Sequence, residues 1–380
     1  MAPTTSTRKP LPAGILAAVV GLILGVIVLQ IVNLGIETLW ITLPEQWGTA
    51  PAWYVLGMLI AAGALVYVIR RYVGDAGHEP IGGIKVSPVT PKQYVGVILA
   101  ILVTLWGGAV LGPEVALVAT GSMVGTVVAN RFGFSDVKDQ TKVIGLGALG
   151  AILALVVGPI LTGSATVSGA PTAIEVPQLA WAIPVAIIAT VAVVIARVIA
   201  ALIARAAGGQ PKLLVLVGAG IVVAVCALLM QAITGETVVY VATSGEELIA
   251  DLPTLTSVST LVAIIIFKTI AYAVSLGAGF RGGPFFPAMF VGASVGLLAS
   301  LTLPAGPNAQ AAIVVGVVAA TIATARMPWW VAIVLGIVIG FLMGTWTLVP
   351  AAVIGAIVAR AIPRLGDRVA SAPQGSPAVS

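Results

Sequence analysis

Charged side chains are scarce in this chain. Asp, Glu, Lys and Arg make up 8% of its 380 residues and apolar residues 59%, whereas a soluble globular domain carries about 25% charged residues. A water-soluble core cannot bury this much apolar surface, so lipid must surround much of the chain. Apolar stretches of about 20 residues, long enough to cross a bilayer as helices, recur along the sequence. They lack the alternation of barrel strands, so the composition predicts a polytopic α-helical membrane protein.

The residues on which enzymes most often rely are also scarce. The chain has one cysteine, Cys226, and one histidine, His78. One cysteine cannot form an internal disulfide, and the few His, Cys and acidic residues suggest neither a metal cluster nor a nucleophile–base pair. We therefore expect a protein that is not an enzyme and that binds no metal or cofactor. The net charge of +5 comes from Lys and Arg in tails and loops, which argues against nucleic acid as a partner.

The placement of Lys and Arg predicts the orientation in the membrane. Arg8 and Lys9 precede the first apolar segment, and further arginines lie at the end of the chain. The loops at 37–48 and 235–253 contain acidic residues but neither Lys nor Arg. Because positively charged loops stay on the cytoplasmic side, we expect both termini in the cytoplasm and both acidic loops outside. The expected location is the plasma (inner) membrane of a bacterium.

Several apolar segments are interrupted by a proline that follows glycine or methionine. The resulting pieces are too short to span a membrane alone. Broken helices at membrane depth are tolerated where they line a cavity or are covered by protein. In transporters they often mark the binding site. The interrupting pairs are Gly112-Pro113, Gly158-Pro159, Gly283-Pro284 and Met327-Pro328.

An internal repeat emerges when the broken segments are aligned. Residues 111–125 match residues 282–296: each has Gly-Pro, then a glycine nine residues after the first glycine of that pair, then another four further on. Gly147 and Gly316 are each followed by proline after twelve residues. We therefore predict a duplication, with a tail at 1–12, helical repeats at 13–206 and 207–362, and a tail at 363–380. Whether the repeats are parallel or inverted depends on the number of crossings.

Glu114 is the acid that lies most clearly within apolar sequence. It follows Gly112-Pro113, and proline suits the first turn of a helix, where its missing N–H would have no partner. Glu114 is therefore expected at a helix N-terminus, where free N–H groups and the helix dipole attract anions. Its carboxylate could occupy an anion site and leave it when protonated. The alternative is a carboxylate that only caps its own helix.

The second copy of the motif, Gly283-Pro284-Phe285-Phe286-Pro287, predicts a second helix N-terminus. Its first turn offers the N–H groups of Phe285 and Phe286. Two termini aimed at one point would bind a dehydrated anion without a full positive charge, which would hold the anion too tightly for rapid passage. The alternative is a close helix–helix contact built on glycine.

These motifs, in this order, resemble the CLC family of chloride channels and chloride/proton antiporters. Residues 111–125 resemble the family's Gly-Arg-Glu-Gly-Pro helix, and residues 282–296, with Lys268 upstream, resemble its Gly-x-Phe-x-Pro helix. The resemblance implies an all-α fold of two inverted repeats of broken and tilted helices, in a homodimer with one pore per subunit. Only eighteen residues follow Ile362, so we expect a short member without cytoplasmic regulatory domains.

The resemblance also implies roles for individual residues. Glu114 resembles the gating glutamate. Gly77 and His78 fall near the family's anion-coordinating serine, and Thr345 falls near its coordinating tyrosine, although neither residue type is present there. Lys268 either pairs with a backbone carbonyl or lines a vestibule. The residues that would form the anion site around Glu114 are Gly112, Pro113, Gly283, Pro284, Phe285 and Phe286.

The function implied by the resemblance is transport of small anions, chloride first, through a pore in each subunit gated by Glu114. Antiporters of the family often have a second glutamate after the Gly158-Pro159 position, and this stretch has no acid. Its absence favours passive or weakly proton-coupled transport. The alternatives are a chloride/proton or fluoride/proton antiporter and, less favoured, a cation-coupled solute carrier. Expected partners are chloride or another small anion, protons if transport is coupled, the lipid bilayer and a second copy of the chain.

Overall fold

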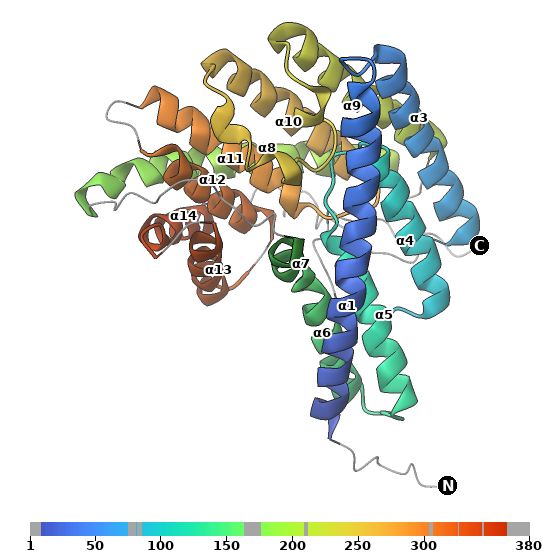
Figure 1. Ribbon diagram of the computed structural model, residues 1–380. Coiled ribbons are helices and arrows are strands. Elements are labelled where there is room, and N and C mark those ends of the chain that lie inside the picture. Colours follow the sequence, from blue (N-terminus) through green and yellow to red (C-terminus); the bar gives the residue numbers. More distant parts are fainter. Residues whose placement is uncertain are drawn as a thin grey trace, which may run out of the picture.

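The computed structural model describes residues 9–74, 81, 86–162, 176–208, 212–303, 307–325, 327–343 and 346–362. The regular structure of these residues is helical (Figure 1). Within them, seven helices are long and apolar enough to cross a membrane. The predicted class, a polytopic α-helical membrane protein, is therefore confirmed.

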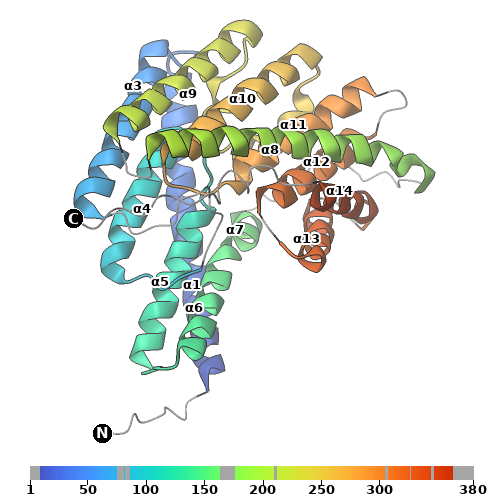
Figure 2. The same ribbon diagram turned by 180° about the vertical axis from the view of Figure 1, so that it is seen from behind.

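Up to residue 162 the chain forms one group of helices. α1, α5 and α6 pack side by side and project from the rest of the molecule at the end where the N-terminus lies (Figures 1 and 2). The helices are α1 (Pro10–Ile36), continued by η1 (Glu37–Thr42) and α2 (Leu43–Glu45), then α3 (Ala52–Val68), continued by η2 (Ile69–Val73), α4 (Pro91–Trp106), α5 (Glu114–Arg131), α6 (Val137–Ile152) and α7 (Ala154–Thr162).

From residue 176, the helices α8, α11, α13 and α14 pack around α12, whereas α9 packs on α3 and α10. In Figure 2, the view from behind, α8 runs across the foreground, and it packs against α10, α11 and α12. The elements are η4 (Val176–Trp181), α8 (Ala182–Ala207), α9 (Leu213–Thr234), η5 (Val238–Tyr240), η6 (Glu246–Leu248), η7 (Leu252–Thr254), α10 (Val258–Ala278), α11 (Phe285–Thr302), α12 (Ala309–Thr324), α13 (Trp329–Leu342) and α14 (Val349–Ala361).

The outer surfaces of the long helices are apolar. Ile23 of α1 and Ile188 of α8 expose 55% and 56% of their surface, which would be costly in water but suits lipid. The helix contacts inside are built on small residues instead. Such residues let helix backbones approach closely where lipid removes the usual hydrophobic drive for association.

The predicted repeat corresponds to two helix pairs with the same contact. Gly121 of α5 packs on Gly147 of α6, and Gly292 of α11 packs on Gly316 of α12. In each pair, a Cβ on either glycine would collide with the backbone of its partner. The glycines that revealed the repeat in the sequence are therefore those that allow close packing within each pair.

The break expected at Gly158-Pro159 is wrong. α7 runs from Ala154 through both residues, and the interruption lies at Leu153, between α6 and α7. α1 packs closely along α6, with Gly25 against Ala151, and then along α7. The interruption is confined to Leu153, whose N–H still donates to the Leu149 carbonyl at 3.1 Å.

Candidate functional site

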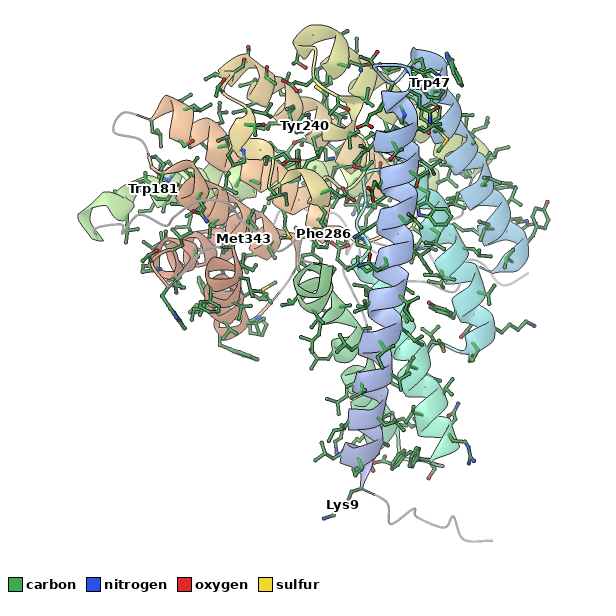
Figure 3. All side chains as sticks on the ribbon, viewed as in Figure 1. Lys9, Trp47, Trp181, Tyr240, Phe286 and Met343 are labelled. Atoms are coloured by element: carbon green, nitrogen blue, oxygen red, sulfur yellow. The ribbon has the colours of Figure 1, made fainter. Side chains whose placement is uncertain are left out.

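α5 and α11 begin beside each other. The N–H of Gly112 donates to the carbonyl of Gly283 at 2.7 Å, and the N–H of Gly283 donates to the carbonyl of Gly112 at 2.6 Å. The two glycines are equivalent in the repeat, so this antiparallel bridge joins the two halves at corresponding points. Each helix begins directly after its proline, Pro113 or Pro284. The free N–H groups of both helices are thus brought to one place, near Phe286 at the centre of Figure 3.

The carboxylate of Glu114 lies at this meeting point. Glu114 is 4% exposed, and the N–H of Phe286 donates to its Oε1 at 2.7 Å. The N–H groups of Phe285 and of Glu114 itself also interact with the carboxylate. A carboxylate of the first half therefore sits on N–H donors of the second, where short charge-assisted hydrogen bonds hold it.

Two glycines make room for the carboxylate. A Cβ on Gly112 would lie 2.7 Å from Oε1 of Glu114. A Cβ on Gly283 would collide with Oε2. Neither glycine has the positive φ that would itself require glycine, so both are needed for space rather than for backbone conformation.

Hydroxyl groups hold the segments that lead into both helices. The N–H of Val110 donates to Ser275 Oγ at 3.0 Å, and the N–H of Arg281 donates to Thr104 Oγ1 at 3.2 Å. The hydroxyl of Tyr272, which is fully buried, donates to the carbonyl of Pro284 at 2.9 Å. These contacts tie the Gly-Pro motifs to α4 and α10, so the helix N-termini are held in fixed positions.

The loop between α9 and α10 folds back toward the site. Lys268 of α10 is fully buried, and its Nζ donates to the carbonyls of Ala242 and Thr243 at 3.3 and 3.1 Å. The pairing of Lys268 with backbone carbonyls, one of its two predicted alternatives, is therefore what the structure shows. Burial raises the pKa of Glu246 in this loop, and the negative charges of Glu247 and Glu114 raise it further. Glu246 thus lies close enough to Glu114 for the charge of Glu114 to act on it.

Seven of the ten residues that the sequence predicts for the site lie together at this point. The structure brings together Gly112, Pro113, Glu114, Gly283, Pro284, Phe285 and Phe286. Gly77, His78 and Thr345 lie outside the described residues. The transport roles of all ten residues stay predictions.

Sequence reasoning missed Tyr272, Arg197 and Glu246. Arg197 had a readable signal, because it is a charge inside a long apolar segment, and such charges mark functional sites in membrane proteins. Tyr272 had none, since a single tyrosine in an apolar helix is unremarkable. Glu246 was assigned only to an outer acidic loop.

Comparison with known proteins agrees with this picture. Residues 140–364 match the family described as "Voltage gated chloride channel". The "Putative ion-transport protein YfeO" of Salmonella choleraesuis (strain SC-B67) is 27% identical over 344 residues, covering 79% of this chain and 82% of the relative. YfeO of Salmonella schwarzengrund (strain CVM19633) is 28% identical over 346 residues, with the same coverage.

Solved structures share the fold. A slow cyanobacterial Cl⁻/H⁺ antiporter superposes with a TM-score of 0.73 at 16% identity, covering 96% of this chain and 94% of the other. A CLC-type fluoride/proton antiporter gives 0.63 at 17% identity, covering 93% and 94%. At these identities the likeness concerns the fold, which includes the two inverted repeats. Because the family match spans more than half of the chain, the protein belongs to the voltage gated chloride channel family, the CLC family that its two Gly-Pro motifs resemble.

Proposed function

We propose that the protein transports small anions, chloride first, along a pathway that passes the meeting point of α5 and α11 and is gated by Glu114. One observation carries this proposal: the Glu114 carboxylate accepts a hydrogen bond of 2.7 Å from Phe286 of the opposite helix terminus. It sits where free N–H groups and two helix dipoles favour negative charge. The carboxylate oxygens stand where an anion would bind.

A carboxylate and a mobile anion would compete for this position. Two unit charges about 4 Å apart repel by about 4 kcal/mol at an effective dielectric constant of about 20. An anion therefore enters when the carboxylate leaves, and protonation of Glu114 or displacement by the anion opens the pathway. Gly112 and Gly283 leave space for either occupant.

Passive or weakly coupled transport is the first form of this proposal. Residues 154–162 of α7 contain no acid, so this helix supplies no inner carboxylate that could pass on a proton from Glu114. We expect a homodimer with one pathway per subunit, which cross-linking in membranes would test.

Coupled exchange of protons with chloride or fluoride is the second candidate. Oε2 of Glu114 is buried and accepts no close hydrogen bond from the described residues. A buried carboxylate oxygen without a donor suits a group that binds a proton during transport.

Flux from liposomes distinguishes the two forms. Chloride, fluoride and proton movements are measured together for the wild type, Glu114→Gln, Glu114→Ala and a control, Glu37→Gln, which alters an exposed acid. Passive transport predicts anion flux with no uphill proton movement, and flux that no longer responds to pH in both Glu114 variants. Uphill proton movement driven by an anion gradient, abolished in Glu114→Gln, identifies the exchanger. Absence of both anion fluxes in the wild type would contradict the proposal.

A further inference from the structure

We propose that Arg197 and Tyr272 form a relay that strengthens the anion site from behind, through the peptide group that joins Pro284 to Phe285. Neither side chain contacts the anion in this proposal, so both are positioning residues. The inference rests on the proposed function, because a relay to this terminus matters only if an anion binds there.

The peptide group between Pro284 and Phe285 connects the relay to the site. Its carbonyl accepts the hydroxyl hydrogen of Tyr272 at 2.9 Å, and its N–H, on Phe285, interacts with the Glu114 carboxylate. In a trans peptide the C=O and N–H bonds point in opposite directions. Tyr272 therefore lies behind the peptide, and the anion position lies in front of it.

Arg197 of α8 supplies the charge. Its guanidinium lies near enough to the Tyr272 hydroxyl for its charge to act on that group, and its Nη2 donates to the carbonyl of Ile81 at 3.2 Å. The positive charge thus faces the Tyr272 oxygen, whose hydrogen is donated to Pro284. A charged side chain within a membrane helix is costly. The contacts of Arg197 with the Tyr272 hydroxyl and the Ile81 carbonyl offset part of this cost.

The order of the bonds determines the effect. Hydrogen bonds in series polarise one another, and a low dielectric strengthens them. The positive charge of Arg197 makes the Tyr272 hydroxyl a better donor, which draws electrons toward the Pro284 carbonyl and leaves the Phe285 N–H more positive. The anion would then meet a stronger N–H donor, while the full charge of Arg197 stays behind Tyr272 and the peptide group that joins Pro284 to Phe285. A site built in this way binds more tightly without the trapping that a direct Arg contact would cause.

Anion binding by the full-length protein tests the relay. Titration calorimetry with chloride, and separately with fluoride, is performed in the Glu114→Ala background, so that the carboxylate does not compete. Tyr272→Phe keeps the ring but removes the donated hydrogen bond, and we expect binding to weaken roughly three- to tenfold. Tyr54→Phe is the matched control, since its hydroxyl also donates to a backbone carbonyl, that of Leu39, away from the site. We expect unchanged binding in this control.

A double-mutant cycle separates the relay from a direct effect of the Arg197 charge. Arg197→Gln should weaken binding by a similar factor, and the combined Tyr272→Phe, Arg197→Gln protein should bind no more weakly than Tyr272→Phe alone. If Tyr272→Phe does not yield monodisperse protein, Arg197→Gln and Arg197→Lys decide together. A loss of affinity in both supports the relay, because lysine keeps the charge but not the guanidinium contact, whereas a loss in Arg197→Gln alone or in neither variant overturns it.

Two other outcomes also overturn the relay. Losses that multiply in the double variant mean that Arg197 acts through its field alone, and unchanged affinity in Tyr272→Phe means that the peptide needs no support. In both cases the anion site itself still stands. If the Glu114→Ala protein binds neither chloride nor fluoride, the proposed function fails and the relay fails with it.

Discussion

Replacing Gly283 with alanine should force the gate open. A Cβ at this position would overlap Oε2 of Glu114 and lie 3.1 Å from the Glu114 Cβ. The backbone of Gly283 does not have a positive φ, so alanine itself is not strained there. The atom in its way is the end of a flexible side chain, and the least costly response is rotation of the carboxylate out of the site.

The size of the effect follows from the hydrogen bond that is lost. Rotation breaks the bond from the Phe286 N–H to Oε1, and hydrogen bonds to charged groups contribute about 1.5–3 kcal/mol. The ratio of closed to open states should therefore fall roughly tenfold to a hundredfold in Gly283→Ala.

Chloride efflux from liposomes at acidic and neutral pH measures this shift. The wild type should be faster at acidic pH, where protonated Glu114 leaves the site. Gly283→Ala should lose this pH dependence, as Glu114→Ala does, although its methyl group also takes space from the anion and should keep the flux below that of Glu114→Ala. Gly57→Ala is the control, because a Cβ there would meet no atom within 4 Å. Wild-type pH dependence in Gly283→Ala would refute this position of the gate. Slow flux in Gly283→Ala that is restored in the Gly283→Ala, Glu114→Ala double variant would mean that the methyl group traps the carboxylate rather than displacing it.

Three further predictions concern stability, measured by thermal unfolding in detergent. Lys268→Met should cost about 1–3 kcal/mol, because two buried carbonyls lose their donor, whereas Lys138→Met on the surface should be neutral. Glu246→Gln should stabilise the protein near neutral pH but not near pH 4. The pKa of Glu246 is raised in the folded protein, so above the ordinary carboxyl pKa of about 4.3 the unfolded chain ionises more readily, and this ionisation opposes folding. Gly316→Ala should cost about 1–3 kcal/mol by pushing α12 from α11, and Gly218→Ala, which faces open space, should not.

Helices and the repeat were readable from the sequence for a physical reason. A long apolar run in lipid can satisfy its backbone only as a helix, and the apolar run that begins at Leu213 is accordingly the helix Leu213–Thr234. The starts of α5 and α11 were predictable from Gly-Pro, because proline suits the first turn of a helix. Glycine spacing found the repeat because the helix pairs need a small residue at each close contact.

The missed features depend on packing between distant segments. The interruption at Leu153 lies between two helices that both pack on α1, and neither Leu153 nor its neighbours mark a helix end in the sequence. Tyr272 acts on a carbonyl twelve residues ahead and meets Arg197 from another helix. The loop that carries Glu246 folds inward through contacts with Lys268 that no local pattern contains. Sequence pattern therefore located the centre of the site but not the residues that support it.

The two Gly-Pro motifs are equivalent in backbone but differ in chemistry. Gly112 and Gly283 exchange hydrogen bonds, and each is followed by proline and a helix. The first helical residue is Glu114 in one half and Phe285 in the other. Carboxylates from both halves would repel at this distance, and one would have to remain protonated. With a single acid, the donors of both termini face one carboxylate, so under the proposed function one proton or one anion would be enough to open the gate.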